Sequence, residues 1–343
     1  MNFCILGAGS WGTAMAVHLV KLGHGVTLAP RRMEQALSMA SSRENTDYLP
    51  EIHLDQNLQI GCETRPLIME ADILLFACPS KALRETCRRV VEYRKDALNI
   101  RAFLALCKGL EPDTFLLPHE VLSEELGEDA SVGYLSGPTY ARDVAIGKPS
   151  ALVVATSGDE ALQTQIQTAL SSDSLRAYGS DDVHGVGLGS CLKNVYAIAV
   201  GISDGLDLGD NARAALLTRS LHEMVSLGES LGGRPETFYG LSGFGDLMAT
   251  CTGEWSRNRN LGLSIGRGKQ AATVISEQRS VVEGFAATDC FHSLCKAKGL
   301  EAPILSEIRA ILYEGKSPPE ALTSLMNREL KRESKVSSST GSS

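Results

Sequence analysis

The chain has 343 residues, which favours two domains because a single domain usually holds roughly 100–200 residues. Its net charge of −8 and its pI of about 5.5 argue against a nucleic-acid-binding protein, which usually carries a basic face. Nine scattered cysteines without a C-x-x-C pair argue against zinc-knuckle and redox motifs, and they indicate free thiols in a reducing compartment.

The N-terminal sequence MNFCILGAG has no basic region before its apolar run, so it does not resemble a signal peptide. No stretch approaches the ~20 apolar residues that a membrane span requires. We therefore expect a cytoplasmic protein without integral membrane association.

The chain begins with an expected strand, helix and second strand at residues 2–6, 13–22 and 25–30. Between the first strand and the helix lies GAGSWG (7–12), which has the G-x-G-x-x-G spacing of a dinucleotide-binding loop. Strand, glycine turn, helix and strand form the βαβ unit of about 30 residues in which such a loop binds nucleotides.

Each glycine of this loop has a separate expected role. Gly7 would make the tight turn, Gly9 would let the backbone approach a pyrophosphate, and Gly12 would let the helix pack on the strand. The alternative interpretation is that the glycines serve close packing only.

Four further apolar runs predict additional strands of a parallel sheet. They are apolar almost throughout, as expected where helices cover both faces of a sheet. Ligands of such sheets bind beyond the carboxyl ends of the strands, so Lys108 and Gly137 are expected on the ligand side. The runs cover residues 71–79, 102–109, 131–138 and 150–157.

Helical periodicity replaces the strand pattern from residue 183 onward. We expect an α/β N-terminal Rossmann domain with a mostly parallel sheet over residues 1–182, and an all-α substrate and catalytic domain over residues 183–330. The polar, serine-rich end, residues 331–343, is predicted to be disordered.

The end of the second strand bears on the choice of cofactor. NAD-binding sites usually place a carboxylate about 20 residues beyond the glycine loop, but here Ala29-Pro30-Arg31-Arg32 occupies that region. Two guanidinium groups suit a 2′-phosphate, so NADP(H) is favoured over NAD(H), which stays possible. The alternative is that Arg31 and Arg32 belong to a solvated loop.

Several polar residues stand where an apolar element would not need them. Lys193 and Asn194 interrupt an apolar helix, where a buried lysine is costly unless it serves a site or an acid. The glycine-rich segment 240–258 carries Asp246, Thr250, Arg257 and Asn258. No group of His, Cys, Asp or Glu has metal-ligand spacing, so we expect no metal, and we interpret His184 and His222 as structural or solvent-facing.

The combined motifs resemble the bacterial NAD(P)-dependent glycerol-3-phosphate dehydrogenases over nearly the whole chain, to about residue 330. The matching stretches are GAGSWGTA (7–14), CKG (107–109), SGPTYA (136–141), the long segment 192–219, GLSGFGDL (240–247), TCT (250–252), SRN (256–258) and VVEG (281–284). The fold of that family, a Rossmann domain followed by a helical domain, agrees with the pattern of predicted elements.

The resemblance implies reversible reduction of dihydroxyacetone phosphate to sn-glycerol 3-phosphate, which supplies phospholipid synthesis. Lys193 matches the catalytic lysine, a general acid in reduction and a base in the reverse direction. Desolvation and the Lys108 ammonium are expected to lower the pKa of Lys193, while Asp246 opposes that shift and orients the ammonium. The resemblance also implies a homodimer.

Further roles follow from the same resemblance, residue by residue. Catalytic positions are Lys193, Lys108 and Asp246, and substrate positions are Lys108, Gly137, Thr139, Lys193, Asn194, Asp246, Thr250, Ser256, Arg257 and Asn258. Cofactor positions are Gly7, Gly9, Ser10, Trp11, Gly12, Arg31, Arg32, Lys108, Ala141, Arg257, Val281 and Glu283. Four of these residues have simpler alternative interpretations. Lys193 could be a surface-reaching lysine on its helix, Asp246 and Thr250 could only cap a helix, and Trp11 could only pack against its neighbours.

The chain departs from the family pattern at a few positions. Ala29 stands where tryptophan is frequent, a change that bears on packing at the edge of the cofactor, and Gly187 stands where glutamate is common, a change that bears on local rigidity before Lys193. Two other functions compete. A sister reductase acting on another keto compound is disfavoured by the phosphate-binding character of Arg257 and Asn258. A nucleotide-sensing protein without catalysis would be expected to lack Lys193 or Lys108.

Overall fold

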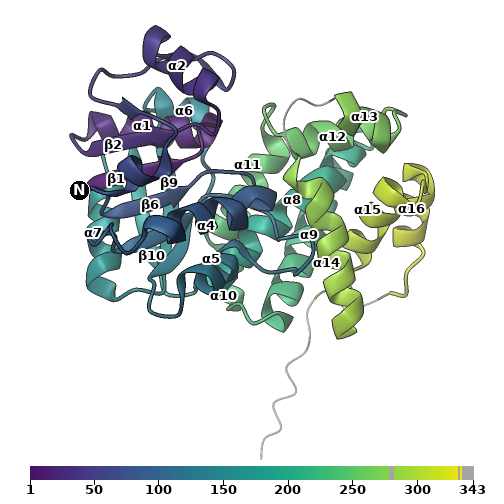
Figure 1. Ribbon diagram of the computed structural model, residues 1–343. Helices are drawn as coiled ribbons and strands as arrows, with labels where there is room; N and C mark the ends of the chain where they lie inside the picture. The colour runs from purple at the N-terminus through teal and green to yellow at the C-terminus, as the bar shows by residue number, and fades with distance from the viewer. Residues whose placement is uncertain (278–281, 331–332, 334–343) are drawn as a thin grey trace, which may run out of the picture.

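The computed structural model describes residues 1–277, 282–330 and 333. Its N-terminal part is built on a large sheet with strand order β10-β9-β8-β7-β6-β1-β2-β5, covered by helices on both faces (Figure 1). All neighbouring strands in it are parallel except β8 and β9, so the expected mostly parallel sheet is confirmed. The strands are β1 (Asn2–Leu6), β2 (Gly25–Ala29), β5 (Gln59–Ile60), β6 (Ile73–Phe76), β7 (Ala102–Ala105), β8 (Val132–Ser136), β9 (Ser150–Thr156) and β10 (Leu175–Ser180).

Two buried clusters explain why the strands are apolar on both sides. One face of the sheet packs against α1 (Ser10–Lys21), α6 (Ala141–Ala145) and α7 (Glu160–Leu170). The other face packs against helices that include α4 (Leu83–Tyr93) and α5 (Pro118–Leu126). Buried apolar area of this extent is the main favourable contribution to folding.

The order of strands reverses its direction at β1. The chain steps from β1 to β2 on one side, and β6 then pairs with the other side of β1. In open α/β sheets a crevice forms at this reversal, beyond the carboxyl ends of the strands, and ligands bind there. The loop of residues 7–9, which leads from β1 into α1, lies at that place.

Smaller elements complete the N-terminal part. A two-stranded antiparallel hairpin, β3 (Glu44–Asn45) and β4 (Leu49–His53), follows α2 (Met33–Ser42). The short helices α3 (Thr64–Ile68) and η1 (Ser80–Ala82) connect the strands on the other side. The sequence pattern did not indicate the hairpin, β5 or β10.

From Val183 onward the described chain is helical, as expected. At its centre lies α8 (Val183–Gly205), and the other helices surround it (Figure 1). The helix α12 (Arg257–Gly266) crosses α8 closely, since a Cβ on Gly201 of α8 would collide with the backbone of Arg259. The helices are α9 (Gly209–Ser230), α10 (Pro235–Tyr239), the π-helical turn η2 (Leu241–Gly245), α11 (Asp246–Thr252), α12 (Arg257–Gly266), α13 (Ala271–Glu277), α14 (Glu283–Lys298), α15 (Pro303–Tyr313) and α16 (Pro318–Met326).

One expectation about membrane segments was wrong. The helix α8 is long and apolar enough to cross a bilayer by length and composition, although no such stretch was expected. Its apolar window is 100% buried inside the protein, so α8 is the core helix of the helical part. Lys193 near its middle is therefore a cation inside a protein core.

Candidate active site

Two lysines share one buried carboxylate where the sheet meets the helical part. Lys193 of α8 lies with its Nζ 3.0 Å from Asp246 Oδ1, and Lys108 Nζ lies 2.6 Å from Asp246 Oδ2. Lys193 also donates to Thr250 Oγ1 at 2.7 Å. The side chains of Lys193 and Asp246 are only 8% and 5% exposed, so solvent screens this group poorly.

This arrangement decides between the alternatives for three residues. Lys193 is buried and paired, so it is not a snorkelling lysine. Asp246 is the first residue of α11, but its carboxylate bonds the two ammonium groups. The Thr250 hydroxyl accepts from Lys193 and bonds Asp246 at 3.3 Å. All three side chains are directed at one another.

Burial and charge act on the pKa values of this group in opposite directions. Burial lowers the pKa of Lys193 and the Lys108 ammonium lowers it further, while Asp246 opposes the shift. Burial alone would raise the pKa of Asp246, but the two lysines outweigh it and hold that pKa below its ordinary value. Asp246 therefore stays ionised, and Lys193 is a better proton donor than an ordinary lysine.

Local structure places these groups. Lys108 follows β7, at the carboxyl end of the sheet. The π-helical turn η2 leads directly into α11 and Asp246. Such turns are rare and concentrate at functional sites.

A chain of amide hydrogen bonds fixes the loop that carries Lys108. Asn194 Nδ2 donates to the Lys108 carbonyl at 2.8 Å, and Asn258 Nδ2 donates to Asn194 Oδ1 at 2.8 Å. Asn258 Oδ1 accepts from the Gly284 N–H at 3.0 Å. The chain links the β7 loop with α8, α12 and α14. Asn194 and Asn258 thus position the loop, whatever further contacts they make to a substrate.

Lys108 is held from two further directions. Its Nζ donates to the Gly137 carbonyl at 3.2 Å, and its backbone N–H donates to Glu283 Oε2 at 3.2 Å. Gly137 has φ +147°, and a Cβ there would lie 2.9 Å from the Ala151 carbonyl oxygen, so glycine is required. Thr139 bonds the same Gly137 carbonyl. The expected substrate residues Gly137 and Thr139 therefore border the lysine group.

The start of α12 offers a site for an anion. Ser256 is the N-cap, and its Oγ accepts from the Arg259 N–H at 3.2 Å. Arg257 follows as the first residue of the helix and is exposed. A helix N-terminus with an adjacent guanidinium suits a phosphate, through free backbone N–H groups and the helix dipole.

The glycine loop has the shape that a dinucleotide requires. Gly7 has φ +121°, and a Cβ there would lie 2.7 Å from the Ala77 backbone at the end of β6. A Cβ on Gly12 would collide with the Gly7 carbonyl, while a Cβ on Gly9 would meet no described atom within 4 Å. Gly7 and Gly12 are thus demanded by close packing, and Gly9 faces open space as a phosphate-contacting residue should.

Residues around this loop hold it in place. Ser10 Oγ donates to the Tyr48 carbonyl at 2.6 Å, in the β3–β4 hairpin. The buried Asn45 donates to the Ala8 carbonyl at 3.0 Å and to Thr13 Oγ1 at 2.8 Å. Gln35 of α2 donates to the same Ala8 carbonyl. Sequence reasoning missed Asn45 and Gln35, because only the fold brings them to the loop.

Trp11 packs on the sheet core, yet its buried indole N–H finds no hydrogen-bond acceptor among the described residues. An unsatisfied buried N–H is uncommon in proteins and indicates a missing partner. Packing alone therefore does not account for Trp11. An acceptor on a bound cofactor would satisfy the indole, so this part of the loop fits a dinucleotide.

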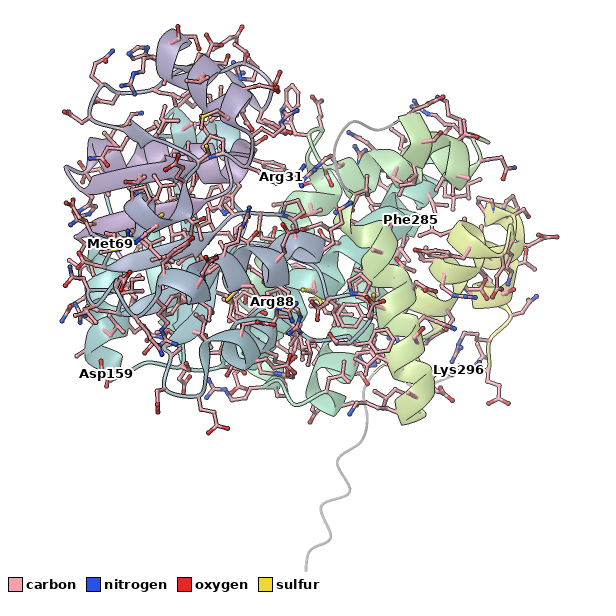
Figure 2. The ribbon with its side chains drawn as sticks, viewed as in Figure 1. Arg31, Met69, Arg88, Asp159, Phe285 and Lys296 are labelled. Atoms are coloured by element: carbon pink, nitrogen blue, oxygen red, sulfur yellow. The ribbon has the colours of Figure 1, made fainter. Side chains whose placement is uncertain are left out.

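Three further residues expected to contact the cofactor, Arg31, Arg32 and Ala141, come after the carboxyl ends of strands β2 and β8. Arg31, which is labelled in Figure 2, and Arg32 are exposed and follow Pro30 after the end of β2. Ala29 is the buried last residue of β2, and Ala141 opens α6 and packs against the core near α1. Val281 lies outside the described residues.

Gly187, where the family often has glutamate, is required by its surroundings. A Cβ at Gly187 would lie 2.7 Å from the hydroxyl oxygen of Tyr134, a fully buried residue of β8. The phenol ring thus takes the space that a side chain at Gly187 would need. This packing of β8 on α8 holds the part of α8 before Lys193 in place without a glutamate at position 187.

Comparisons with known proteins agree with the site. The family described as NAD-dependent glycerol-3-phosphate dehydrogenase matches through its N-terminal part at residues 2–162 and its C-terminal part at residues 182–323. A curated glycerol-3-phosphate dehydrogenase (NAD(P)+) of Thiobacillus denitrificans is 44% identical over 333 residues, which cover 97% of this chain and 100% of that protein.

Solved structures give the same result. The crystal structure of glycerol-3-phosphate dehydrogenase from Coxiella burnetii has a TM-score of 0.89 and 35% identity, and the match covers 95% of this chain and 99% of that one. A ketopantoate reductase from Ralstonia eutropha, with a TM-score of 0.60 at 15% identity and coverage of 91% and 97%, shares the fold alone. The chain therefore belongs to the family of NAD(P)-dependent glycerol-3-phosphate dehydrogenases.

Proposed function

We propose that this chain reduces dihydroxyacetone phosphate to sn-glycerol 3-phosphate, with Lys193 as the proton donor. The observation that carries the proposal is the buried Lys193 ammonium, held by Asp246 and Thr250 beside Lys108. Bound NAD(P)H supplies the hydride for the ketone carbon. The protein must then place a proton on the ketone oxygen as negative charge grows there.

Lys193 meets the requirements of this acid. Its pKa is lowered, which eases proton release, and Asp246 and Thr250 fix the direction of its Nζ. Lys193 gives one proton to the oxygen and becomes a neutral amine, and the hydride and proton together turn the ketone into the secondary alcohol. In the oxidation of the alcohol, the neutral amine takes the proton back.

Lys108 and Asp246 prepare the surroundings for that transfer. The Lys108 ammonium is an electrostatic stabiliser for negative charge developing on the oxygen. Asp246 balances one of the two ammonium groups, so the group of Lys108, Asp246 and Lys193 carries one net positive charge while both lysines are protonated. We assign the substrate phosphate to Arg257 and the N-terminus of α12, with the Asn258 backbone.

The cofactor assignment rests on the loop of residues 7–12 and on the arginines after β2. Gly7, Gly9, Ser10, Trp11 and Gly12 would hold the pyrophosphate and the nearby part of the cofactor. Arg31 and Arg32 would pair with the 2′-phosphate of NADP(H), which we propose as the preferred cofactor, with NAD(H) accepted more weakly. We assign Ala141 and Glu283 to the cofactor side as well, and no metal to the reaction.

The wider context is proposed from the family resemblance. We expect a Rossmann domain over residues 1–182 and a substrate domain over 183–330. We also expect a cytoplasmic homodimer that supplies glycerol phosphate for phospholipid synthesis. Size-exclusion chromatography with light scattering tests the dimer, and a monomer at micromolar concentration would refute it.

A direct assay tests the reaction. Purified protein is mixed with NADPH and dihydroxyacetone phosphate, and loss of reduced-nicotinamide absorbance is followed. Parallel reactions contain NADH in place of NADPH, or unphosphorylated dihydroxyacetone in place of the substrate. We expect turnover that requires the phosphate. Cofactor binding without turnover of the phosphorylated ketone would reject the proposal.

A further inference from the structure

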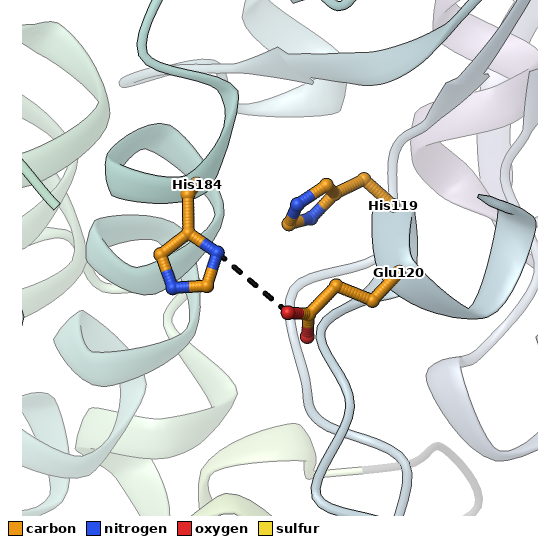
Figure 3. A group of neighbouring side chains, drawn as sticks. All are labelled: His119, Glu120 and His184. Atoms are coloured by element: carbon orange, nitrogen blue, oxygen red, sulfur yellow. Dashed lines mark ion pairs between the residues drawn. The ribbon is translucent and has the colours of Figure 1, made fainter. Parts of the chain in front are cut away.

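Three potential metal ligands converge between the sheet and the helical part. His119 and Glu120 lie in the first turn of α5, and His184 lies in the first turn of α8 (Figure 3). One ligand atom from each residue lies within 4.8 Å of the other two. All three residues are half-buried, so the group is neither fully solvated nor sealed in the core.

Each of the three side chains is also held by a bond on its far side. His184 Nε2 lies 2.9 Å from the Leu231 carbonyl, and Glu120 Oε2 accepts from the Leu117 N–H at 2.7 Å. His119 Nδ1 lies 3.2 Å from the Tyr134 hydroxyl. Metal-binding histidines typically use the second ring nitrogen in this way, which fixes the ring and its tautomer.

The contact of His184 with the Leu231 carbonyl determines which nitrogen of the neutral His184 ring faces Glu120. A carbonyl can only accept, so His184 Nε2 carries the hydrogen and, in the neutral ring, Nδ1 carries the lone pair. That lone pair faces Glu120 Oε1 at 3.7 Å, a distance that the dashed line in Figure 3 marks. Two facing acceptors repel each other unless a proton, a metal ion or a water that donates to both lies between them, so this pair is compatible with a metal ion.

We propose that His119, Glu120 and His184 form a binding site for a divalent transition-metal ion of the Zn²⁺ type. Two imidazole nitrogens and one carboxylate oxygen are ligands that Zn²⁺ accepts, with water in a fourth position. His119 would bind through Nε2, which requires Nδ1–H to donate to the Tyr134 oxygen as a second donor beside the His119 backbone N–H, which bonds the same oxygen at 3.2 Å. The ligand atoms lie up to 4.8 Å apart and must move closer by about 1 Å, since donors about 2.0–2.2 Å from a tetrahedral zinc lie about 3.3–3.6 Å from one another.

The place of the site in the fold indicates its role. Lys193 lies nine positions after His184 on α8, a rise of about 14 Å along the helix axis. The ion would thus lie outside the reaction centre. It would join α5, which packs on the sheet, to α8, the central helix of the helical part. We therefore infer a structural ion that stabilises the fold and is independent of the proposed reaction.

One feature opposes a cation here. Both helices direct their N-termini towards the site, and a helix N-terminus disfavours positive charge. The Glu120 carboxylate compensates, so affinity should depend strongly on its charge. Glu120→Gln is then an informative variant, because the amide oxygen still accepts from Leu117 and preserves the start of α5.

The test uses the untagged protein, free of added cofactor. Isothermal titration with ZnCl₂ measures affinity, and Co²⁺ serves as a spectroscopic substitute. We expect about one Zn²⁺ per chain, a rise in the thermal midpoint with Zn²⁺, and a Co²⁺ spectrum without a thiolate charge-transfer band. Removal of outer partners costs about 10–100-fold in metal affinity, so loss of a ligand in His184→Ala should cost at least that much.

Glu120→Gln should weaken Zn²⁺ binding in the same direction while leaving the metal-free thermal midpoint near that of the unmodified protein. The matched control is His53→Ala, which removes an exposed histidine of β4 and should leave Zn²⁺ affinity unchanged. Unaltered Zn²⁺ binding in His184→Ala and Glu120→Gln, or a thiolate band with Co²⁺, would overturn the proposal. So would the absence of Zn²⁺ binding.

Discussion

Replacing Lys193 by methionine should remove catalysis while leaving the fold intact. The triad holds two ammonium groups and one carboxylate, and Lys193→Met leaves Asp246 paired with Lys108 at 2.6 Å. The surroundings already lower the pKa of Lys193, which means that the folded protein disfavours its charge. Removal of that charge should therefore not reduce the thermal midpoint.

Asp246→Asn is the contrasting variant, because it removes the buried carboxylate that the ammonium groups of Lys193 and Lys108 share. Breaking a buried ion pair by removing one partner costs about 3–5 kcal/mol. Loss of a general acid lowers the rate about 10²–10⁴-fold, and each factor of ten corresponds to about 1.4 kcal/mol. We thus expect Lys193→Met to lose activity alone and Asp246→Asn to lose activity and stability.

The assay follows NADPH oxidation with saturating dihydroxyacetone phosphate, beside thermal denaturation of each variant. Circular dichroism confirms that the variants are folded at the assay temperature. If folded Lys193→Met retained a kcat within about tenfold of the unmodified protein, Lys193 would not be the principal proton donor. If Asp246→Asn were as stable as the unmodified protein, the charge balance described for the triad would be incorrect.

Three further predictions concern pH, packing and cofactor choice. Reduction needs protonated Lys193, so kcat/KM for reduction should fall as pH rises through its lowered pKa, and alcohol oxidation should rise there; parallel profiles in the two directions would contradict this. Gly187→Ala should destabilise the fold by about 1–3 kcal/mol in urea unfolding, because its Cβ would meet Tyr134, and an unchanged midpoint would refute that packing. Replacing Arg31 and Arg32 by alanine should reduce kcat/KM about 10–100-fold with NADPH and little with NADH, and equal losses would reject their assignment to the 2′-phosphate.

Much of the fold could be predicted because buried parallel strands have near-continuous apolar sequences. The edge strand β10 was missed for the same reason: its residues alternate between buried and exposed, so LRAYGS has no apolar run. The strand β5 spans only Gln59 and Ile60, which is too short to give a pattern. The hydropathy of α8, high enough for a membrane span, reflects its burial by other helices and, at its start, by β8.

The sequence allowed us to predict which residue types form the site, but not the hydrogen bonds that link them. Lys193 inside an apolar helix is costly unless a partner is present, which is a signal readable from sequence. The amide chain through Asn194 and Asn258 depends on four elements meeting, and no spacing encodes that.

His119 and His184 likewise come from separate helices, so no metal-ligand spacing exists along the chain. The predicted disorder of residues 331–343 falls outside the described residues except for Glu333. It stays a prediction.

The most direct test of the central claim is a crystal structure of this chain with NAD(P)⁺ and dihydroxyacetone phosphate, a complex in which the oxidised cofactor has no hydride to transfer. We predict that Lys193 Nζ lies about 2.6–3.2 Å from the ketone oxygen, with the phosphate at Arg257 and the N-terminus of α12. A ketone oxygen that contacts neither Lys193 nor a water bonded to it would contradict the role of Lys193 as the proton donor.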